Sequence, residues 1–214
     1  MFQLVESSAD QSEGEIKRRK KRRRKLRFIC PCCLVSYSEI GDKCSGCGYS
    51  AAICMARFPY AAPALSGLQL FRNGAEVTNF FGARSLTILN KLRKSFPELG
   101  VYVVVVDLGE GVECREFAFW LYNAAPFGES DSVAKRQGGV MLLVDTNGGK
   151  ATVVTVYGIE PYLNPDRITG DLGKLEKNLK KRRIEKAVEI WLLLLLRHLR
   201  DAHARSKDLQ GGEF

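Results

Sequence analysis

Residues 138–162 read GGVMLLVDTNGGKATVVTVYGIEPY, and this stretch decides the fold. The apolar run 140–144 and the β-branched run 151–156 are typical of two strands. Between them, Thr-Asn-Gly-Gly supplies residues that adopt positive φ in a tight turn. We therefore predict a central β-hairpin, followed by a helix that has Asn164 as its N-cap and Pro165 in its first turn.

A further strand and two helices are predicted before this hairpin. Residues 102–106 read YVVVV, and an uninterrupted β-branched run is typical of a strand buried on both faces of an α/β sheet. A helix is expected on each side of it, because apolar residues recur there at three- and four-residue steps. These residues are Leu86, Leu89, Leu92 and Phe96 before the strand, and Phe117, Trp120, Leu121 and Ala124 after it.

The residues after the hairpin predict two more helices. The first has an apolar stripe within residues 168–179, and the basic residues 180–183 separate it from a last helix that begins at Ile184. The chain then reads α-β-α-β-β-α-α, with three strands. This order predicts an α/β fold, a three-layer α/β/α sandwich with a small mixed sheet. A small zinc-ribbon-like module and a disordered basic tail are expected to precede it.

The positive charge belongs to one segment. The chain has 214 residues and a net charge of +9, but the run that begins at Lys17 and ends at Arg27 holds ten Lys or Arg in eleven positions. Without those ten charges the remainder carries −1, so overall basicity is no argument for nucleic-acid binding by the folded part. Two interpretations of the run stay open. It is a solubilising tail, or it contacts nucleic acid or an anionic surface through phosphate charge.

Four cysteines have metal-ligand spacing. Cys30 with Cys33, and Cys44 with Cys47, form two C-x2-C pairs separated by ten residues. Each pair can direct two thiolates at one centre, and four thiolates complete a tetrahedral zinc shell. A structural zinc site in a zinc-ribbon or rubredoxin-like knuckle is predicted, because no His, Asp or Glu takes one of the four places. Cys32 is a less suitable ligand than Cys33, because a C-x-C pair chelates poorly.

The composition predicts five parts along the chain. The segment 51–70 is rich in Ala, Pro and Gly, which is typical of a linker. The parts are a disordered basic tail at 1–27, the zinc-ribbon-like module at 28–50, a linker at 51–70, the α/β domain at 71–204 and a disordered tail at 205–214.

The location is predicted to be cytoplasmic. The first thirty residues contain no apolar segment typical of a secretory leader. No stretch reaches the roughly 20 apolar residues that a transmembrane helix needs. Seven cysteines without a leader favour metal binding or free thiols over a disulfide framework.

The order of motifs over residues 71–203 resembles the TPM domain family, which includes a thylakoid-lumen phosphatase and many bacterial envelope proteins. The matching segments are FWLYN at 119–123, GVMLLV at 139–144, YGIE at 157–160 and KAV at 186–188. The resemblance implies an α/β/α sandwich and, for some members, metal-dependent phosphatase activity. The chain departs from the family just before the middle strand, where residues 135–138 read KRQG and lack the family's acidic residue.

Acidic residues at strand ends are the weaker candidate site. Asp107 follows the first predicted strand and Asp145 the second, so both reach one edge of the sheet if these strands are parallel neighbours. With Glu160, and with Asp131 and Asp166 nearby, they could hold Ca²⁺ or Mg²⁺ through oxygen ligands. An acid after a strand is also an ordinary turn former.

Two functions remain open from the sequence. The first is a binding or adaptor protein with a protein partner, or with a nucleic acid or anionic surface as partner. The second is a metal-dependent phosphatase, with Asp107 and Asp145 as candidate catalytic residues. His198 and His203 lie five apart on the last helix and are expected to be packing or surface residues. Cys54 and Cys114 are expected to pack.

Overall fold

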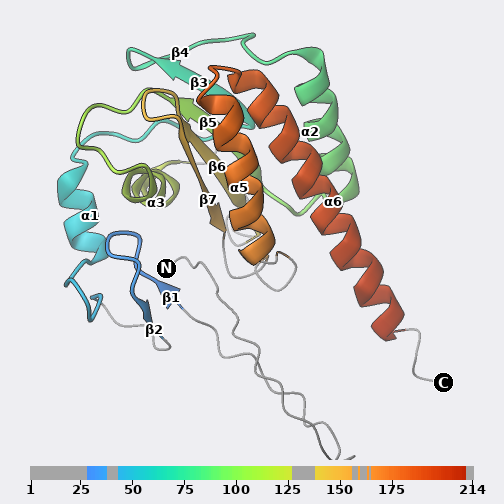
Figure 1. The fold of residues 1–214 in the computed structure, drawn as a ribbon, viewed down its shortest axis with the longest axis horizontal. Coiled ribbons are helices and arrows are strands. Elements are labelled where there is room, and N and C mark those ends of the chain that lie inside the picture. Colours follow the sequence, from blue (N-terminus) through green and yellow to red (C-terminus); the bar gives the residue numbers. More distant parts are fainter. Residues whose placement is uncertain are drawn as a thin grey trace, which may run out of the picture.

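The fold is known here from a computed structural model that describes residues 28–37, 43–126, 138–155, 159, 163 and 165–210. Figure 1 shows a sheet with helices on both sides and a small hairpin below it. The hairpin consists of β1 (Phe28–Ile29) and β2 (Ser36–Tyr37). The sheet strands are β3 (Leu68–Arg72), β4 (Ala75–Glu76), β5 (Val101–Val106), β6 (Val140–Asp145) and β7 (Lys150–Thr155). The helices are α1 (Ala51–Arg57), α2 (Ala83–Ser95), α3 (Cys114–Ala124), α5 (Pro165–Leu179) and α6 (Ile184–Gln210).

The sheet has the strand order β4-β3-β5-β6-β7. β3, β5 and β6 are parallel, whereas β4 and β7 run antiparallel to their neighbours, so the sheet is mixed. β6 and β7 form the predicted hairpin, in which Val140 pairs with Thr155 and Asp145 with Lys150. Gly149 in its turn has a φ of +61°, a conformation that disfavours residues with a Cβ.

Each face of the sheet has its own hydrophobic core. Along β5, Val101, Val103 and Val105 face α2, α5 and α6, while Tyr102 and Val104 face α3 on the other side. This alternation follows from the period of two in a strand. The predicted three-layer α/β/α sandwich is therefore confirmed. The continuous β-branched run of β5 reflects the burial of this strand on both faces of the sheet.

The two parallel connections pass over opposite faces of the sheet. From β3 to β5 and from β5 to β6 the chain moves across the sheet in the same direction. α2 packs on one face and α3 on the other. Connections that move the same way over opposite faces have opposite hands, so one of them departs from the usual right-handed rule. The two faces are consequently covered by different parts of the chain.

The segment predicted as a linker at 51–70 contains secondary structure. It forms α1 and then enters the sheet as β3, so the expectation of three strands is wrong and the sheet has five. The polar Gln69 interrupts the apolar pattern of β3, which hides the strand in the sequence. Its buried amide is satisfied locally, because Ser66 N donates to Oε1 at 2.9 Å and Nε2 donates to the Ala64 carbonyl at 3.0 Å.

Two smaller expectations also differ from the structure. On α2, Leu86 is exposed and Ile88 takes its place in the core beside Leu89 and Leu92. The last helix runs on to Gln210, past the predicted domain end at residue 204. The basic run at 17–27, Asp131 and Glu160 lie outside the described residues.

The unexpected strand β3 supplies a test of the architecture. Leu70 is 1% exposed in β3, and Leu70→Ala should lower the free energy of unfolding by about 2–5 kcal/mol because it leaves a cavity in the core. Leu193→Ala, at a residue 41% exposed on α6, should change it by less than about 0.5 kcal/mol. Urea denaturation of both variants measures the difference. Equal effects would contradict the placement of β3 in the sheet.

Candidate metal centre

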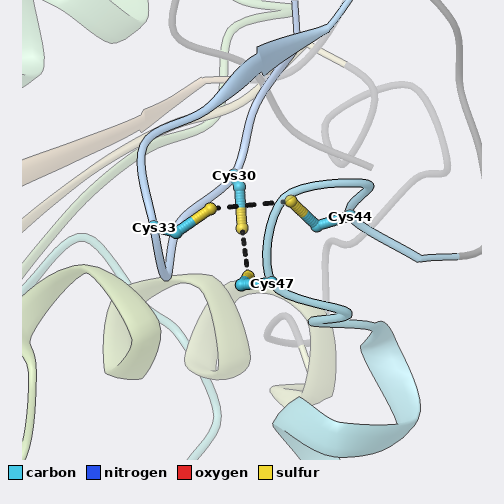
Figure 2. A group of neighbouring side chains, drawn as sticks. All are labelled: Cys30, Cys33, Cys44 and Cys47. Atoms are coloured by element: carbon cyan, nitrogen blue, oxygen red, sulfur yellow. Dashed lines mark hydrogen bonds between the residues drawn. The ribbon is translucent and has the colours of Figure 1, made fainter.

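Four cysteines from two loops converge beside the sheet. Cys30 and Cys33 lie in the turn after β1, and Cys44 and Cys47 lie in the turn before α1. Figure 2 shows their sulfur atoms pointing toward one another. The Sγ atoms of all four lie within 4.8 Å of one another, and no other group of this kind occurs among the described residues.

The distances between the sulfurs fit one tetrahedral ion. Cys30 Sγ lies 3.7 Å from Cys47 Sγ, and Cys33 Sγ lies 3.6 Å from Cys44 Sγ. Four thiolates about 2.3 Å from a zinc ion at tetrahedral angles are about 3.8 Å apart. A disulfide would need about 2.05 Å between the sulfurs. The cluster can therefore hold a metal ion.

The two cysteine turns have the same backbone form. Cys30 N donates to the Val35 carbonyl at 3.1 Å, and Cys44 N donates to the Tyr49 carbonyl at 2.8 Å. The residue after the second cysteine has positive φ in both turns, at +64° for Leu34 and +74° for Gly48. The turns are thus related by a repeated geometry that brings each cysteine pair to the same centre.

The turn at Cys44 stabilises a thiolate. Burial raises the pKa of Cys44, but the N–H groups of Cys47 and Gly46 outweigh it and lower that pKa to about 7. Gly46 N lies 3.3 Å from the Cys44 sulfur. In contrast, burial raises the pKa of Cys30 to about 12, so this thiol needs the charge of a cation nearby to ionise. The thiolate is the form that binds a metal ion.

Cys32 lies outside the four-cysteine cluster and points to the α/β domain. The carboxylate of Glu116 on α3 raises the pKa of the Cys32 thiol to about 11. Glu116 also forms an ion pair with Arg57 on α1. The guanidinium of Arg57 in turn lies 5.5 Å from the centre of the Tyr49 ring. This chain of contacts ties the cysteine turns, α1 and α3 together.

The cysteine turns share a core with the sheet. Cys30, Cys44, Tyr49 and Cys54 belong to the same buried cluster as Trp120. Aromatic rings continue this contact along α3. Tyr49 meets Phe119 with 6.4 Å between ring centres, and Phe58 meets Trp120 at 5.3 Å. The cysteine turns and α1 therefore pack against α3, which covers this face of the sheet, whereas three helices cover the other face.

The acids predicted at the strand ends reach one edge of the sheet. β5 and β6 are parallel neighbours, and Val106 pairs with Asp145 at their ends. Asp107 is exposed. Asp145 is 6% exposed, and its oxygens accept three backbone N–H groups, from Leu108 at 3.2 Å, Asn147 at 3.0 Å and Gly148 at 2.9 Å.

Asp145 therefore joins the loop after β5 to the turn after β6. Its carboxylate accepts hydrogen bonds from backbone N–H groups of both segments, as in an Asx turn that also reaches the loop after the neighbouring strand. The divalent-cation site at Asp107, Asp145 and Glu160 stays a prediction, because Glu160 lies outside the described residues.

A buried hydrogen bond joins α5 to α6. His198 Nε2 lies 2.6 Å from Asp171 Oδ2, and Lys174 Nζ donates to Asp171 Oδ1 at 2.8 Å. Burial raises the pKa of Asp171, but the bonds from Lys174 and His198 outweigh burial and lower it. The sequence gives no signal for this pair, because its members are 27 positions apart on separate helices. His198 is thus a packing residue with a polar partner.

Comparisons with known proteins concern the fold. No protein-family model matches the sequence, and no curated protein matches it. The NMR structure of BA42 protein from the psychrophilic bacterium Bizionia argentinensis is similar at 14% identity, with a TM-score of 0.43, over 59% of this chain and 86% of that one. The N-terminal domain of a protein from P. gingivalis is similar at 12% identity, with a TM-score of 0.43, over 58% of this chain and 79% of that one. Neither similarity carries information about function.

Among the helices of the described residues, none combines the length and apolar character needed to cross a membrane.

The four-cysteine cluster makes a direct prediction about metal content. We expect one tightly bound metal ion per chain in the purified protein, measured by elemental analysis. Cys44→Ser should lose most of this ion, because it removes one of four thiolates. Cys32→Ser should keep it, because Cys32 is not one of the four cysteines whose sulfur atoms converge. Loss of the ion from Cys32→Ser, or a wild-type protein without metal, would contradict the assignment.

The role of Asp145 predicts a difference between the two strand-end acids. Asp145→Asn places an amide donor among three backbone N–H groups and should cost about 1–3 kcal/mol of stability. Asp107→Asn, at an exposed position, should change stability by less than about 0.5 kcal/mol. Denaturant unfolding of the two variants compares them. An Asp145→Asn variant with the stability of the wild type would show that these backbone hydrogen bonds do not contribute to stability.

Proposed function

We propose that this protein is a non-catalytic binding protein, with a TPM-like α/β domain, a structural zinc ion in the cysteine turns and a nucleic acid as its partner. Its basic segment at 17–27 would contact the phosphate backbone. The observation that carries the non-catalytic assignment is the set of three backbone N–H bonds on Asp145. These bonds use three of the roughly four acceptor positions of the carboxylate, which leaves about one for a cation or a substrate.

Zinc is the ion that best fits the cysteine cluster. Four sulfur ligands in tetrahedral arrangement favour zinc or iron, and zinc is the usual choice for a closed knuckle of two C-x2-C pairs. Four thiolates leave no open position for water or a substrate, so the ion would be structural. A reducing compartment such as the cytoplasm would keep the thiols available as ligands.

The positive charge of residues 17–27 favours a nucleic acid as the partner. Ten cations in eleven positions at 17–27 provide a high density of positive charge with no pattern of base-reading side chains. Such a segment binds phosphate by releasing counterions, which supports affinity but not sequence specificity. The tail would therefore bind nucleic acids of many sequences.

Salt dependence tests this proposal. The full chain should bind a fluorescent 20-nucleotide oligouridylate with log Kobs falling steeply with log salt concentration, since each phosphate contact contributes a slope of about −0.7 for single strands. A chain without residues 17–27 should bind at least about tenfold more weakly, with a shallower slope. A full-length variant with Lys91→Gln and Lys94→Gln, at exposed positions on α2, serves as the control for loss of charge outside the tail. Equal binding and slope with and without the tail would refute the proposal.

Phosphatase activity is the competing function. We expect no hydrolysis of p-nitrophenyl phosphate above background in the presence of Ca²⁺, Mg²⁺ or Mn²⁺. Turnover that is lost in both Asp107→Asn and Asp145→Asn would favour the enzyme instead. The stability of each variant is measured in parallel, so that unfolding of Asp145→Asn is not mistaken for loss of a catalytic group.

A further inference from the structure

The turn between α5 and α6 carries a second concentration of positive charge. Lys177, Lys180, Lys181, Arg182 and Arg183 are all exposed. We call these five residues the α5–α6 basic turn. In the part of the chain that the structure describes, none of them forms an ion pair. Their charges are therefore available to a partner.

The backbone of the turn is a Schellman motif. Arg183 N donates to the Asn178 carbonyl at 3.0 Å, and Arg182 N donates to the Leu179 carbonyl at 2.7 Å. Arg182 then occupies the position after the helix end that glycine usually takes, with a φ of +54°. A residue with a Cβ is disfavoured there, because the Cβ approaches a carbonyl oxygen. The chain thus keeps an arginine where glycine would fold more easily.

The helix dipole explains only part of the charge. Cations in the last turn of α5 interact favourably with its C-terminal carbonyls, which accounts for Lys177 and Lys180. This effect fades beyond the last turn, and Arg183 directly precedes α6, where a helix N-terminus disfavours a cation. Arg182 and Arg183 therefore need another explanation.

The surroundings favour a phosphate backbone over a lipid surface. The turn lies at the end of the sheet where β6 leads into β7 (Figure 1), and Lys180 lies beside Gly149 of that turn. Binding to a lipid surface usually needs exposed apolar residues next to the cations. In the described chain, the large exposed apolar residues are Leu34, Val35, Ile53, Met55, Tyr60, Leu86 and Leu193, all outside residues 177–183.

We propose that the α5–α6 basic turn is a second contact surface for the phosphate backbone of a nucleic acid. This inference rests on the proposed function and adds a surface on the folded domain to the contact made by residues 17–27. Figure 1 shows the turn at the opposite end of the molecule from β1. Two separate basic sites on one chain raise the affinity for a polymer long enough to reach both.

The test uses the full chain and a matched control. The triple variant Lys181→Gln, Arg182→Gln and Arg183→Gln removes three charges from the turn. The control Lys91→Gln, Lys94→Gln and Arg200→Gln removes three exposed charges elsewhere. With a fluorescent 20-nucleotide oligouridylate, the turn variant should bind about tenfold more weakly, and its slope of log Kobs against log salt should be shallower by about 2. The control should keep the wild-type slope.

The outcomes separate this inference from the proposed function. If deletion of residues 17–27 weakens binding while the turn variant binds like the wild type, the inference fails and the proposed function stands. If the turn variant and the control lose affinity equally, net charge is responsible and the inference also fails. If the wild type does not bind the oligonucleotide, both fail. Loss of binding to phosphatidylserine vesicles alone would assign the turn to a lipid surface and overturn the inference.

A single substitution separates a functional from a structural role. Arg182→Gly relieves the positive-φ conformation, so it should raise the melting temperature by about 2–4 °C. It should at the same time weaken oligonucleotide binding several-fold. Higher stability with unchanged binding would show that Arg182 does not contact the nucleic acid and would contradict the proposal.

Discussion

The rest of the structure depends on the burial of β5 and β6 on both faces. These two parallel strands consist almost entirely of valine, leucine and methionine, and each of their faces has to be covered by other parts of the chain. α2, α5 and α6 cover one face. α3 covers the other, and α1 and the cysteine turns pack against α3 within the same buried cluster. A metal ion held by these turns would thus stabilise a wall of the hydrophobic core as well as its own loop.

The sequence predicts the elements whose pattern is local. The hairpin of β6 and β7, the strand predicted from the run 102–106 and the helices after residue 164 follow from residue periodicity and turn residues, and the structure contains all of them. β3 and α1 escape detection because a short strand with a buried Gln69 and a helix rich in alanine resemble a linker. Their structure is imposed by tertiary contacts, which a local pattern does not record.

The candidate sites also differ in whether a local sequence pattern predicts them. Ligand spacing identifies Cys30, Cys33, Cys44 and Cys47 directly, because C-x2-C geometry is encoded within each turn. The contact of Cys32 with Glu116 and the bond between His198 and Asp171 join residues far apart in sequence, so no motif reveals them. The acid at Asp145 shows the reverse case. Its position after a strand predicts a ligand, whereas its three hydrogen bonds to backbone N–H groups appear only in the structure.

Hydrogen exchange with and without the metal ion tests the central claim most directly. Because the cysteine turns and α3 share one buried cluster, removal of the ion by a chelator should reduce the protection of amides in α3 and in α1. The account predicts that protection returns when zinc is added back. Unchanged protection of α3 after complete removal of the metal would show that the cysteine turns fold beside the sheet without supporting it.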